Sequence, residues 1–238
     1  MVLYQMDVAR FITVYIVQLG MGIIYLIFGL IILKRDTKRL NQLFSTFYIL
    51  SASATIVNVI YVSINTNPTV KILHFTTYFL FCFAMVYLLV FTLIVIKSEK
   101  VFTVKKHNLI AVIYGALLLG LAPIGWYGGI TIDASTDWRP VWSLAFLIYA
   151  LIVISVCSVI PTIYYSIEVY KKFEDEVIKK KWAYYILAIM DYFIILYLTS
   201  ISNYLNNPTF RLFTSIAGLT LYATAFLLYY GVGKQIEK

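Results

Sequence analysis

The sequence has few charged residues, few prolines and very few cysteines and histidines. Of its 238 residues, 13% are charged, 5 are proline, 2 are cysteine and 2 are histidine. A water-soluble domain carries about 25% charged residues. The chain is 62% hydrophobic and has a mean hydropathy of +0.87, an excess that is typical of lipid-facing surface. This composition excludes an ordinary soluble domain and predicts a membrane protein.

The rare residue types also exclude several kinds of catalytic and cofactor site. His74 and His107 fall at opposite ends of two apolar runs, which excludes a shared zinc or bis-histidine haem site. Cys82 and Cys157 lie inside apolar runs, where no structural disulfide is expected. The last apolar run lacks the lysine of a retinal pigment, and the runs together hold too few aspartates for an aspartyl protease. We expect no metal, no cofactor and no enzymatic activity.

Long apolar runs define the architecture. A membrane-spanning helix needs ~20 mostly apolar residues. Runs of about this length occur at 11–33, 43–63, 72–96, 109–126, 141–170, 182–202 and 210–230. We therefore predict an all-α, polytopic membrane protein that forms a single seven-helix bundle embedded in the lipid bilayer.

Basic residues fall in alternate loops, and their placement predicts the orientation. Of the 19 Lys and Arg residues, 15 lie in the loops after the first, third and fifth runs and in the C-terminal tail. The other side has only Arg10, Lys71, Arg139 and Arg211. Short basic loops stay in the cytoplasm, so we expect an outside N-terminus, a cytoplasmic C-terminus and a multi-pass location in the cell membrane. The net charge of +8 is thus an orientation signal, and we expect no nucleic-acid partner.

The first ten residues lack the basic region and the small-residue cleavage site of a signal peptide. We therefore expect the first span to remain in the mature protein.

Asp191 is the strongest candidate for a ligand or proton site. It lies near the middle of the sixth run, where an ionisable side chain is costly and is often functional. Matching depths along the runs predicts a shared polar pocket with hydroxyls from three other spans: Ser51, Ser53, Ser155, Ser158 and Thr220. The alternative is a structural aspartate that only bonds neighbouring helices.

Pro161 predicts a kink in the fifth span, because proline removes a backbone hydrogen-bond donor. Such a kink serves either plain packing or a hinge, and Pro161 is our hinge candidate.

Two loops differ from the others in character. In the loop from Tyr170 to Lys181, Asp175 precedes Lys179 and Glu176 precedes Lys180 by four residues, which favours a helix that runs past the membrane and turns into the sixth span. This loop is either a solvated helical extension or a docking surface for a cytoplasmic partner. The loop from Tyr127 to Pro140 is the longest irregular stretch and has room for a short turn or lid.

A short internal echo suggests a 3+1+3 arrangement of the spans. Asn67, Pro68 and Thr69 before the third span recur as Asn207, Pro208 and Thr209 before the seventh. Such an echo fits a parallel duplication, or two independent helix starts with Asn as N-cap and Pro in the first turn.

The layout resembles the seven-helix sensory region at the N-terminus of many prokaryotic histidine kinases. The resemblance rests on span number and orientation, on the loop end from Trp138, Arg139 and Pro140 to Trp142, and on the basic link before the sixth span. It implies a receptor-like sensory module, and because no kinase domain precedes Lys238, its signal would leave through a partner. A small-solute or proton-coupled transporter is the alternative. A non-catalytic scaffold, assembled into an oligomer through small-residue helix faces, is a third hypothesis.

Overall fold

The computed structural model describes residues 8–35 and 38–234, and within them the chain is almost entirely helical. Seven helical stretches in this part of the chain are long and apolar enough to cross a membrane. The first is α1 (Val8–Phe11), η1 (Ile12–Gln18) and α2 (Leu19–Arg35), followed by α3 (Arg39–Val62), α4 (Thr69–Val101), and α5 (Val104–Leu119) with α6 (Leu121–Ile124) and η2 (Gly125–Gly129). The last three are α7 (Leu144–Ile154) with η4 (Ser155–Val159) and α8 (Ile160–Lys172), α9 (Glu176–Leu205), and α10 (Pro208–Ala217) with α11 (Thr220–Leu228) and η5 (Tyr229–Gly233). The predicted all-α class and the seven apolar helices are confirmed.

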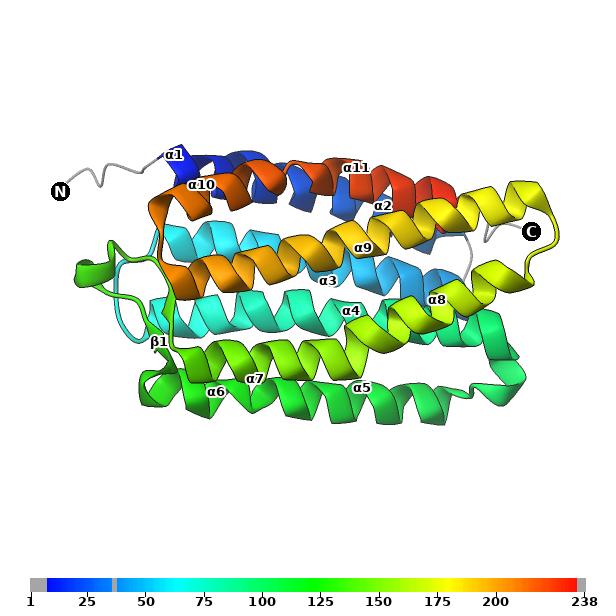
Figure 1. Cartoon of the computed structure of the whole chain (residues 1–238), viewed down its shortest axis with the longest axis horizontal. Coiled ribbons are helices and arrows are strands. Elements are labelled where there is room, and N and C mark those ends of the chain that lie inside the picture. The colour runs from blue at the N-terminus through cyan, green and yellow to red at the C-terminus, as the bar shows by residue number, and fades with distance from the viewer. Residues whose placement is uncertain (1–7, 36–37, 235–238) are drawn as a thin grey trace.

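The helices run side by side along one long axis (Figure 1). Consecutive spans pack against each other, and the seventh span closes the bundle because α10 and α11 contact both α9 and the first span. The third span, α4, is the most buried, and the fourth span, which runs from α5 to η2, is the least buried. The bundle has two distinct ends, called here the hairpin end and the basic end. Figure 1 shows β1 at the first and the link from α8 to α9 at the second.

Aromatic side chains fill the middle of the bundle. The core contains several fully buried rings: Tyr25, Phe44, Phe47, Tyr48, Phe91, Tyr185 and Phe193. Several buried hydroxyls in this region are bonded: Tyr48 Oη donates to the carbonyl of Ala225 at 2.9 Å, and the hydroxyls of Thr92 and Tyr185 lie 2.9 Å apart. The hydroxyl of Tyr25 is an exception, because it has no partner among the described residues. An unmet polar group in an apolar interior costs on the order of 2–7 kcal/mol. The middle layer is therefore cross-linked by hydrogen bonds between helices.

The fifth span changes direction between α7 and α8 (Figure 1). The change falls at η4, a π-helical segment that ends just before Pro161. Proline cannot donate to the carbonyl four residues earlier and its ring crowds that carbonyl, so wider turns relieve the clash. The bend thus has a local cause in the sequence. Motion of Pro161 as a hinge stays a prediction.

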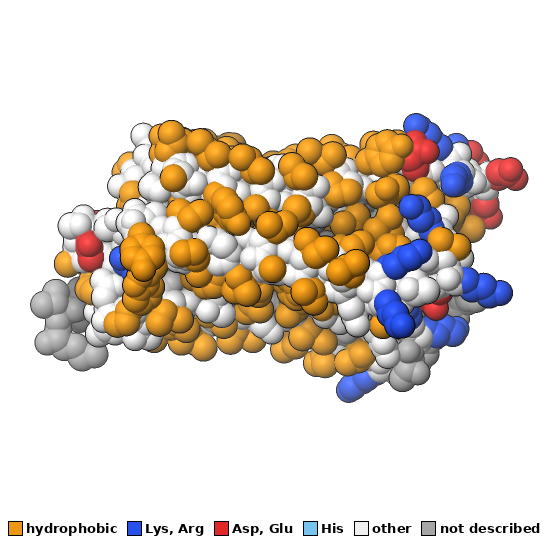
Figure 2. Space-filling view, turned by 90° about the horizontal axis from the view of Figure 1, so that it is seen from below, with side chains coloured by type: hydrophobic (Ala, Val, Ile, Leu, Met, Phe, Trp, Pro, Cys, Tyr) orange, Lys and Arg blue, Asp and Glu red, His pale blue; other side chains and the backbone are white. Residues whose placement is uncertain are grey.

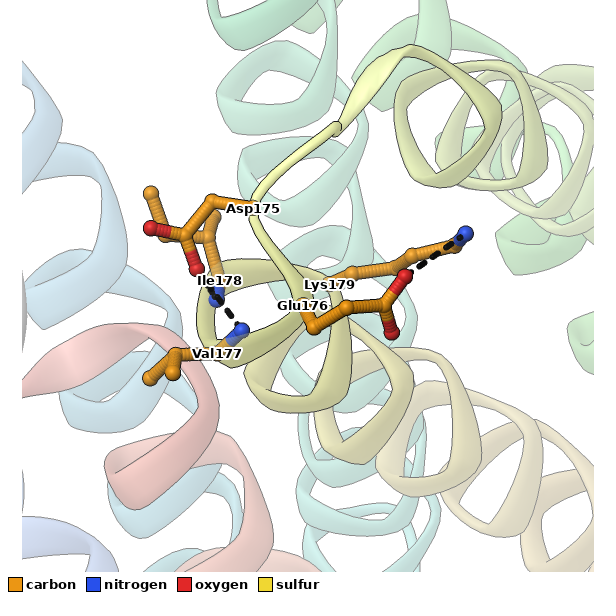
Figure 3. A network of polar contacts seen from close by, with 5 residues as sticks. All are labelled: Asp175, Glu176, Val177, Ile178 and Lys179. Atoms are coloured by element: carbon orange, nitrogen blue, oxygen red, sulfur yellow. Dashed lines mark hydrogen bonds and ion pairs between the residues drawn. The ribbon is translucent and has the colours of Figure 1, made fainter.

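The link between the fifth and sixth spans differs from the predicted helical pairing. α8 ends at Lys172, and α9 begins at Glu176. Figure 3 shows the reason: Asp175 caps α9, because its Oδ1 accepts from the backbone N–H groups of Val177 at 2.7 Å and Ile178 at 3.2 Å. Glu176 pairs with Lys179 at 3.6 Å, three residues on. The predicted pairing of Asp175 with Lys179 is therefore wrong, since the cap occupies that carboxylate.

A small hairpin covers the other end of the bundle. β1 (Ile130–Thr131) pairs antiparallel with β2 (Val141–Trp142), and a turn of 3₁₀ helix, η3 (Ala134–Thr136), lies between them. The fifth span therefore begins at Leu144, capped by Ser143, three residues after the approximate start predicted at Val141. Cross-links to the bundle hold the hairpin down. Asn67 Nδ2, for example, donates to the carbonyl of Ile132 at 3.0 Å.

The two Asn-Pro-Thr segments adopt different local roles. Asn207 caps α10, since its Oδ1 accepts from the N–H of Phe210 at 3.0 Å. The residue at the N-cap of α4 is instead Pro68, which makes no side-chain cap, and Asn67 bonds the hairpin. The expected pair of equivalent Asn caps is thus wrong for the third span. The 3+1+3 arrangement stays a prediction.

Candidate functional site

A cavity of about 180 Å³ opens among the helices at the hairpin end. It is called here the arginine cavity, after three of its lining residues. Its wall comes from the first, second, third, sixth and seventh spans and from the hairpin. The lining residues used below are Arg10, Val14, Val17, Met21, Asn58, His74, Thr77, Phe81, Arg139, Tyr192, Arg211 and Leu221.

Three arginines from separate segments converge on this cavity. Arg10 comes from α1, Arg139 from the hairpin and Arg211 from the first turns of α10. Arg10 donates to the carbonyls of Asp137 at 3.0 Å and Trp138 at 3.2 Å, and Arg211 donates to that of Pro140 at 2.8 Å. The hairpin backbone therefore fixes where these guanidinium groups lie. Among the described residues, no Asp or Glu side chain lines the cavity.

His74 and Thr77, on one face of α4, add two buried polar atoms to the wall. Trp142 Nε1 donates to His74 Nε2 at 3.1 Å. An indole nitrogen only donates, so Nε2 must accept and the neutral imidazole carries its proton on Nδ1. His74 Nδ1 and Thr77 Oγ1 have no hydrogen-bond partner among the described residues, and the two side chains are only 5% and 6% exposed. Buried polar atoms are nearly always bonded, so these two are exceptions in the wall, and neither atom is itself accessible to a water-sized probe.

The arginines lie at one end of the cavity, at the start of α1, at the start of α10 and in the hairpin. Met21 lies roughly 16 Å further along the first span than Arg10, at about 1.5 Å per residue. This deeper part is lined by both apolar and amide side chains. The apolar ones are Val14, Val17, Met21, Phe81 and Leu221, and the amides are Gln18 and Asn58, of which Asn58 Nδ2 donates to Gln18 Oε1. The charged groups of the cavity therefore lie at its mouth, and its floor is uncharged.

A contiguous stack of aromatic rings continues from the floor. Tyr192, which lines the cavity, lies 5.4 Å from Phe47 between ring centroids. Phe47 lies 6.5 Å from Phe44, and Phe44 lies 5.1 Å from Phe91. Phe91 then lies 6.2 Å from Trp182. These rings form a closed, packed path toward the basic end.

A second and larger cavity, of about 480 Å³, lies at the basic end and is called here the tryptophan cavity. It is lined by Lys38, Arg39, Leu40, Phe91, Val95, Glu99, Phe173, Ile178, Trp182, Gly231 and Val232. Phe91 and Trp182, the last rings of the stack, belong to this wall. The link between α8 and α9, the predicted docking loop, contributes Phe173, and Ile178 follows from the first turn of α9. The ring contacts thus run from the wall of one cavity to the wall of the other.

Asp191 lies at a seam between two helices and lines neither cavity. From α9 it accepts hydrogen bonds from Thr220 Oγ1 at 2.9 Å and from Thr224 Oγ1, both on α11. Asp191 is half-buried and Thr220 is exposed on the outside of the bundle. The structure therefore gives this carboxylate matched donors.

The polar pocket around Asp191, predicted by matching the depths of residues along the spans, does not form. Of its five proposed hydroxyl partners, only Thr220 contacts Asp191. The others bond elsewhere or lie apart: Ser51 with Tyr192 at 3.3 Å, Ser53 with its own helix at Ile49, Ser155 with Tyr197 at 2.7 Å, and Ser158 buried without a partner among the described residues. The physical reason is azimuth, since residues at one depth on different helices point in different directions around each axis.

The residues of the arginine cavity entered the sequence interpretation in other roles. Arg10, Arg139 and Arg211 counted as orientation signals, and His74 only as a possible metal ligand. Within the described part of the chain, no cluster of three or more His, Cys, Asp and Glu side chains is placed to hold a metal ion. One feature of the sequence did point to the cavity. Of the four basic residues at the hairpin end, the three arginines lie beside the start of a helix or the end of a loop. Comparisons with models of protein families, with curated proteins and with solved structures give no match.

Proposed function

We propose that this protein is a receptor-like sensory module of the cell membrane. It has an outside N-terminus and a cytoplasmic C-terminus, binds a small solute in the arginine cavity and signals to a partner at the basic end. The charge distribution supports this orientation, because 15 of the 19 basic residues belong to the loops and tail assigned to the cytoplasm. Figure 2 shows Lys and Arg gathered at one end of an otherwise apolar surface.

The observation that carries the proposal is the aromatic stack between the two cavities. Phe47 and Phe44, the two rings between the cavities, are buried and line neither of them. The stack supplies contiguous packing from Tyr192 to Trp182, and coupling between distant sites is transmitted by such packed side chains when they have two arrangements. A bound solute that displaces Tyr192 is therefore expected to move the wall of the tryptophan cavity.

Irregular helix segments border both cavities. Val14 and Val17 of η1 line the arginine cavity, and Gly231 and Val232 of η5 line the tryptophan cavity. π-helical turns are often found at functional sites, where they permit local rearrangement. The partner surface then includes the loop from Tyr170 to Lys181, because Phe173 and Ile178 belong to the same wall.

A small-solute transporter is the second candidate, because cavities at opposite ends with a barrier between them are also the geometry of alternating access. The two functions differ in what happens to the solute. A transporter must open the aromatic stack and release the solute on the other side, whereas a receptor only changes the shape of the basic end.

One experiment separates these functions. A fluorophore is attached at Ile178→Cys, in a Cys157→Ser background, because Cys157 is the more exposed of the two cysteines and Cys82 is buried. The protein is placed in proteoliposomes, and a panel of small solutes is added while emission and solute uptake are both recorded. We expect an emission change without uptake. Uptake of the active solute would move the assignment to the transporter.

The cavity itself is tested with a matched pair of variants. Val17→Phe fills the arginine cavity, and Ile23→Phe places the same ring on the exposed, lipid-facing side of the same span. We expect Val17→Phe to abolish the emission change and Ile23→Phe to preserve it. A response that survives the filled cavity would place the solute site elsewhere and overturn the proposal.

The orientation has its own test. A cysteine at Ser135, in the exposed turn η3, is treated with a membrane-impermeant reagent on intact cells. We expect labelling without permeabilisation. Labelling of Ser135→Cys only after the cells are opened would invert the orientation.

A further inference from the structure

We propose that Asp191 docks a transmembrane helix of another protein, one that carries a Lys or Arg near its middle. This inference does not depend on the function proposed above. Three features of the surface around Asp191 point to it: the depth of the carboxylate, the lack of a cation beside it in the described part of the chain, and short neighbouring side chains that let a second helix approach closely.

Asp191 lies at the middle of α9 and on the outer surface of the bundle. α9 covers Glu176–Leu205, which puts Asp191 roughly 20 Å from either end of the helix at about 1.5 Å per residue. Leu187 and Ile194, about one turn before and one turn after Asp191, are 57% and 50% exposed. Thr220, which donates to Asp191, is exposed as well. In a bundle embedded in lipid, this carboxylate therefore lies beside hydrocarbon at mid-depth.

The charge of Asp191 is not neutralised by any ion pair in the described part of the chain. Thr220 and Thr224 are neutral donors, and they fill two of the roughly four hydrogen-bonding sites of a carboxylate. The nearest basic residues along the two helices, Lys181 and Arg211, are at least nine residues from the seam, or roughly 13 Å. An aspartate at this depth usually faces the bundle interior or pairs with another group. Asp191 therefore fits a cation supplied from outside the bundle.

The surface of α11 beside Asp191 permits close approach of a second helix. Thr220 and Ala223 are both exposed there, and both have short side chains. Small residues let the backbones of two helices pack closely, and such packing, together with hydrogen bonds between helices, drives helix association in lipid. A helix that lies on this surface would separate the carboxylate from lipid and bring its own side chain within reach of Asp191.

Charge complementarity selects the kind of partner. In a dimer of two copies inserted in the same direction, both Asp191 carboxylates would lie at one depth and repel each other. The described spans of this chain hold no Lys or Arg at mid-depth that could oppose Asp191. A basic side chain from another protein would be attracted, and its charge-assisted hydrogen bond is roughly twice as strong as a neutral one. The occupant is therefore a helix of a different protein.

The test uses synthetic transmembrane helices, because they isolate one side chain. Two peptides of about 20 leucine and alanine residues differ only at the centre, which is Lys in one and Leu in the other. The protein carries a donor fluorophore at Ile178→Cys in the Cys157→Ser background, the peptides carry an acceptor, and energy transfer is recorded in phosphatidylcholine vesicles as the peptide fraction rises. We expect the lysine peptide to bind about tenfold more tightly than the leucine peptide. Equal binding of the two peptides, or binding of neither, would overturn the proposal.

Variants locate the preference for the lysine peptide. Asp191→Asn keeps an acceptor oxygen and removes the charge, so the two peptides should bind it within about twofold of each other. Asp191→Glu keeps the charge and should keep the preference. Ile194→Asn is the matched control, because it places the same amide about one turn away on the exposed surface and leaves Asp191 intact, and it should keep the tenfold preference. A preference that survives in Asp191→Asn would belong to another group and would refute the site.

A third peptide, with Glu at its centre, tests the sign of the charge without any change at Asp191. We expect it to bind no more tightly than the leucine peptide, because two carboxylates repel each other. Binding as tight as that of the lysine peptide would reduce the contact to a hydrogen bond and overturn the cationic partner.

Self-association is measured in the same vesicles, with donor-labelled and acceptor-labelled protein and no peptide. We expect energy transfer no higher than random mixing produces. A dimer that forms in the wild type and is lost in Asp191→Asn would assign this surface to a second copy of the chain and overturn the proposed partner.

Discussion

The arginine cavity and the Asp191 seam are both polar clusters inside an apolar bundle, yet they differ in whether their hydrogen bonds are complete. At the seam, Asp191 accepts from Thr220 and Thr224, so donors and acceptor are matched across two helices. In the cavity, His74 Nδ1 and Thr77 Oγ1 have no partner among the described residues. A matched cluster contributes to the stability of the bundle, whereas an unmatched one costs stability until something binds. Under the proposed function, this difference gives the seam a structural role and the cavity a binding role.

The sharpest way to break this comparison is Asp191→Leu. The change removes the acceptor and leaves the hydroxyl of Thr224 unmet in the packed seam, where it is buried. We expect the free energy of unfolding to fall by about 1–2 kcal/mol, the range of polar contacts between membrane helices. Unfolding in mild detergent, followed by circular dichroism, measures this loss.

Asp191→Asn is the control for that loss, since it keeps an acceptor oxygen for one threonine and should lose less stability. The emission change of the fluorophore at Ile178→Cys should stay unchanged in both variants, because Asp191 does not line the arginine cavity. If either variant kept its stability but no longer responded to the solute, Asp191 would be part of the solute site.

Two threonine variants test the same comparison, with a smaller expected change in the free energy of unfolding. Thr224→Val removes a donor that is bonded to Asp191, and we expect it to cost about 1 kcal/mol. Thr77→Val removes a buried hydroxyl without a described partner, so we expect the free energy of unfolding to stay level or to rise. The same unfolding measurement is used for both. Equal losses in the two variants would show that Thr77 has a bonded role in the unliganded protein and would weaken the assignment of the cavity.

How far the sequence predicts this molecule depends on whether a feature is local along the chain. Hydropathy alone located the seven helices, because each span must satisfy its own backbone in lipid. It placed Asp191 at the right depth but not at the right azimuth, so the hydroxyls of Ser51 and Ser155 were assigned to the wrong neighbourhood. The arginine cavity needs contacts between Arg10, Arg139 and Arg211, which lie in segments far apart in sequence. Their convergence depends on the hairpin folding back over the bundle, and no periodicity encodes that.

The bond from Trp142 to His74 illustrates the same limit. Each residue was visible in the sequence, one as an interfacial aromatic and the other as a lone histidine. Their pairing fixes the tautomer of His74 and thereby the chemistry of the cavity wall. It exists because Trp142 belongs to β2, whereas the hydropathy pattern predicted the fifth span to start at Val141.

The smallest expected effect concerns the hairpin turn. This third polar cluster is exposed to water, unlike the Asp191 seam and the arginine cavity. The hydroxyl of Ser135 donates to Asp133 Oδ1 at 2.6 Å, and with the backbone N–H bonds it lowers the pKa of the Asp133 carboxyl from its ordinary value of 3.8. A lowered pKa means that this cap contributes its full stability above pH 3.8 and loses it as the pH falls through the folded-state pKa. The protection factor of the Ser135 amide, which is its exchange rate relative to an unstructured peptide at the same pH, should therefore fall as the pH drops below 3.8. Asp133→Asn keeps the acceptor but does not titrate, so its protection factor should not change with pH in this range. A fall in protection that persists unchanged in Asp133→Asn would assign the titration to another group.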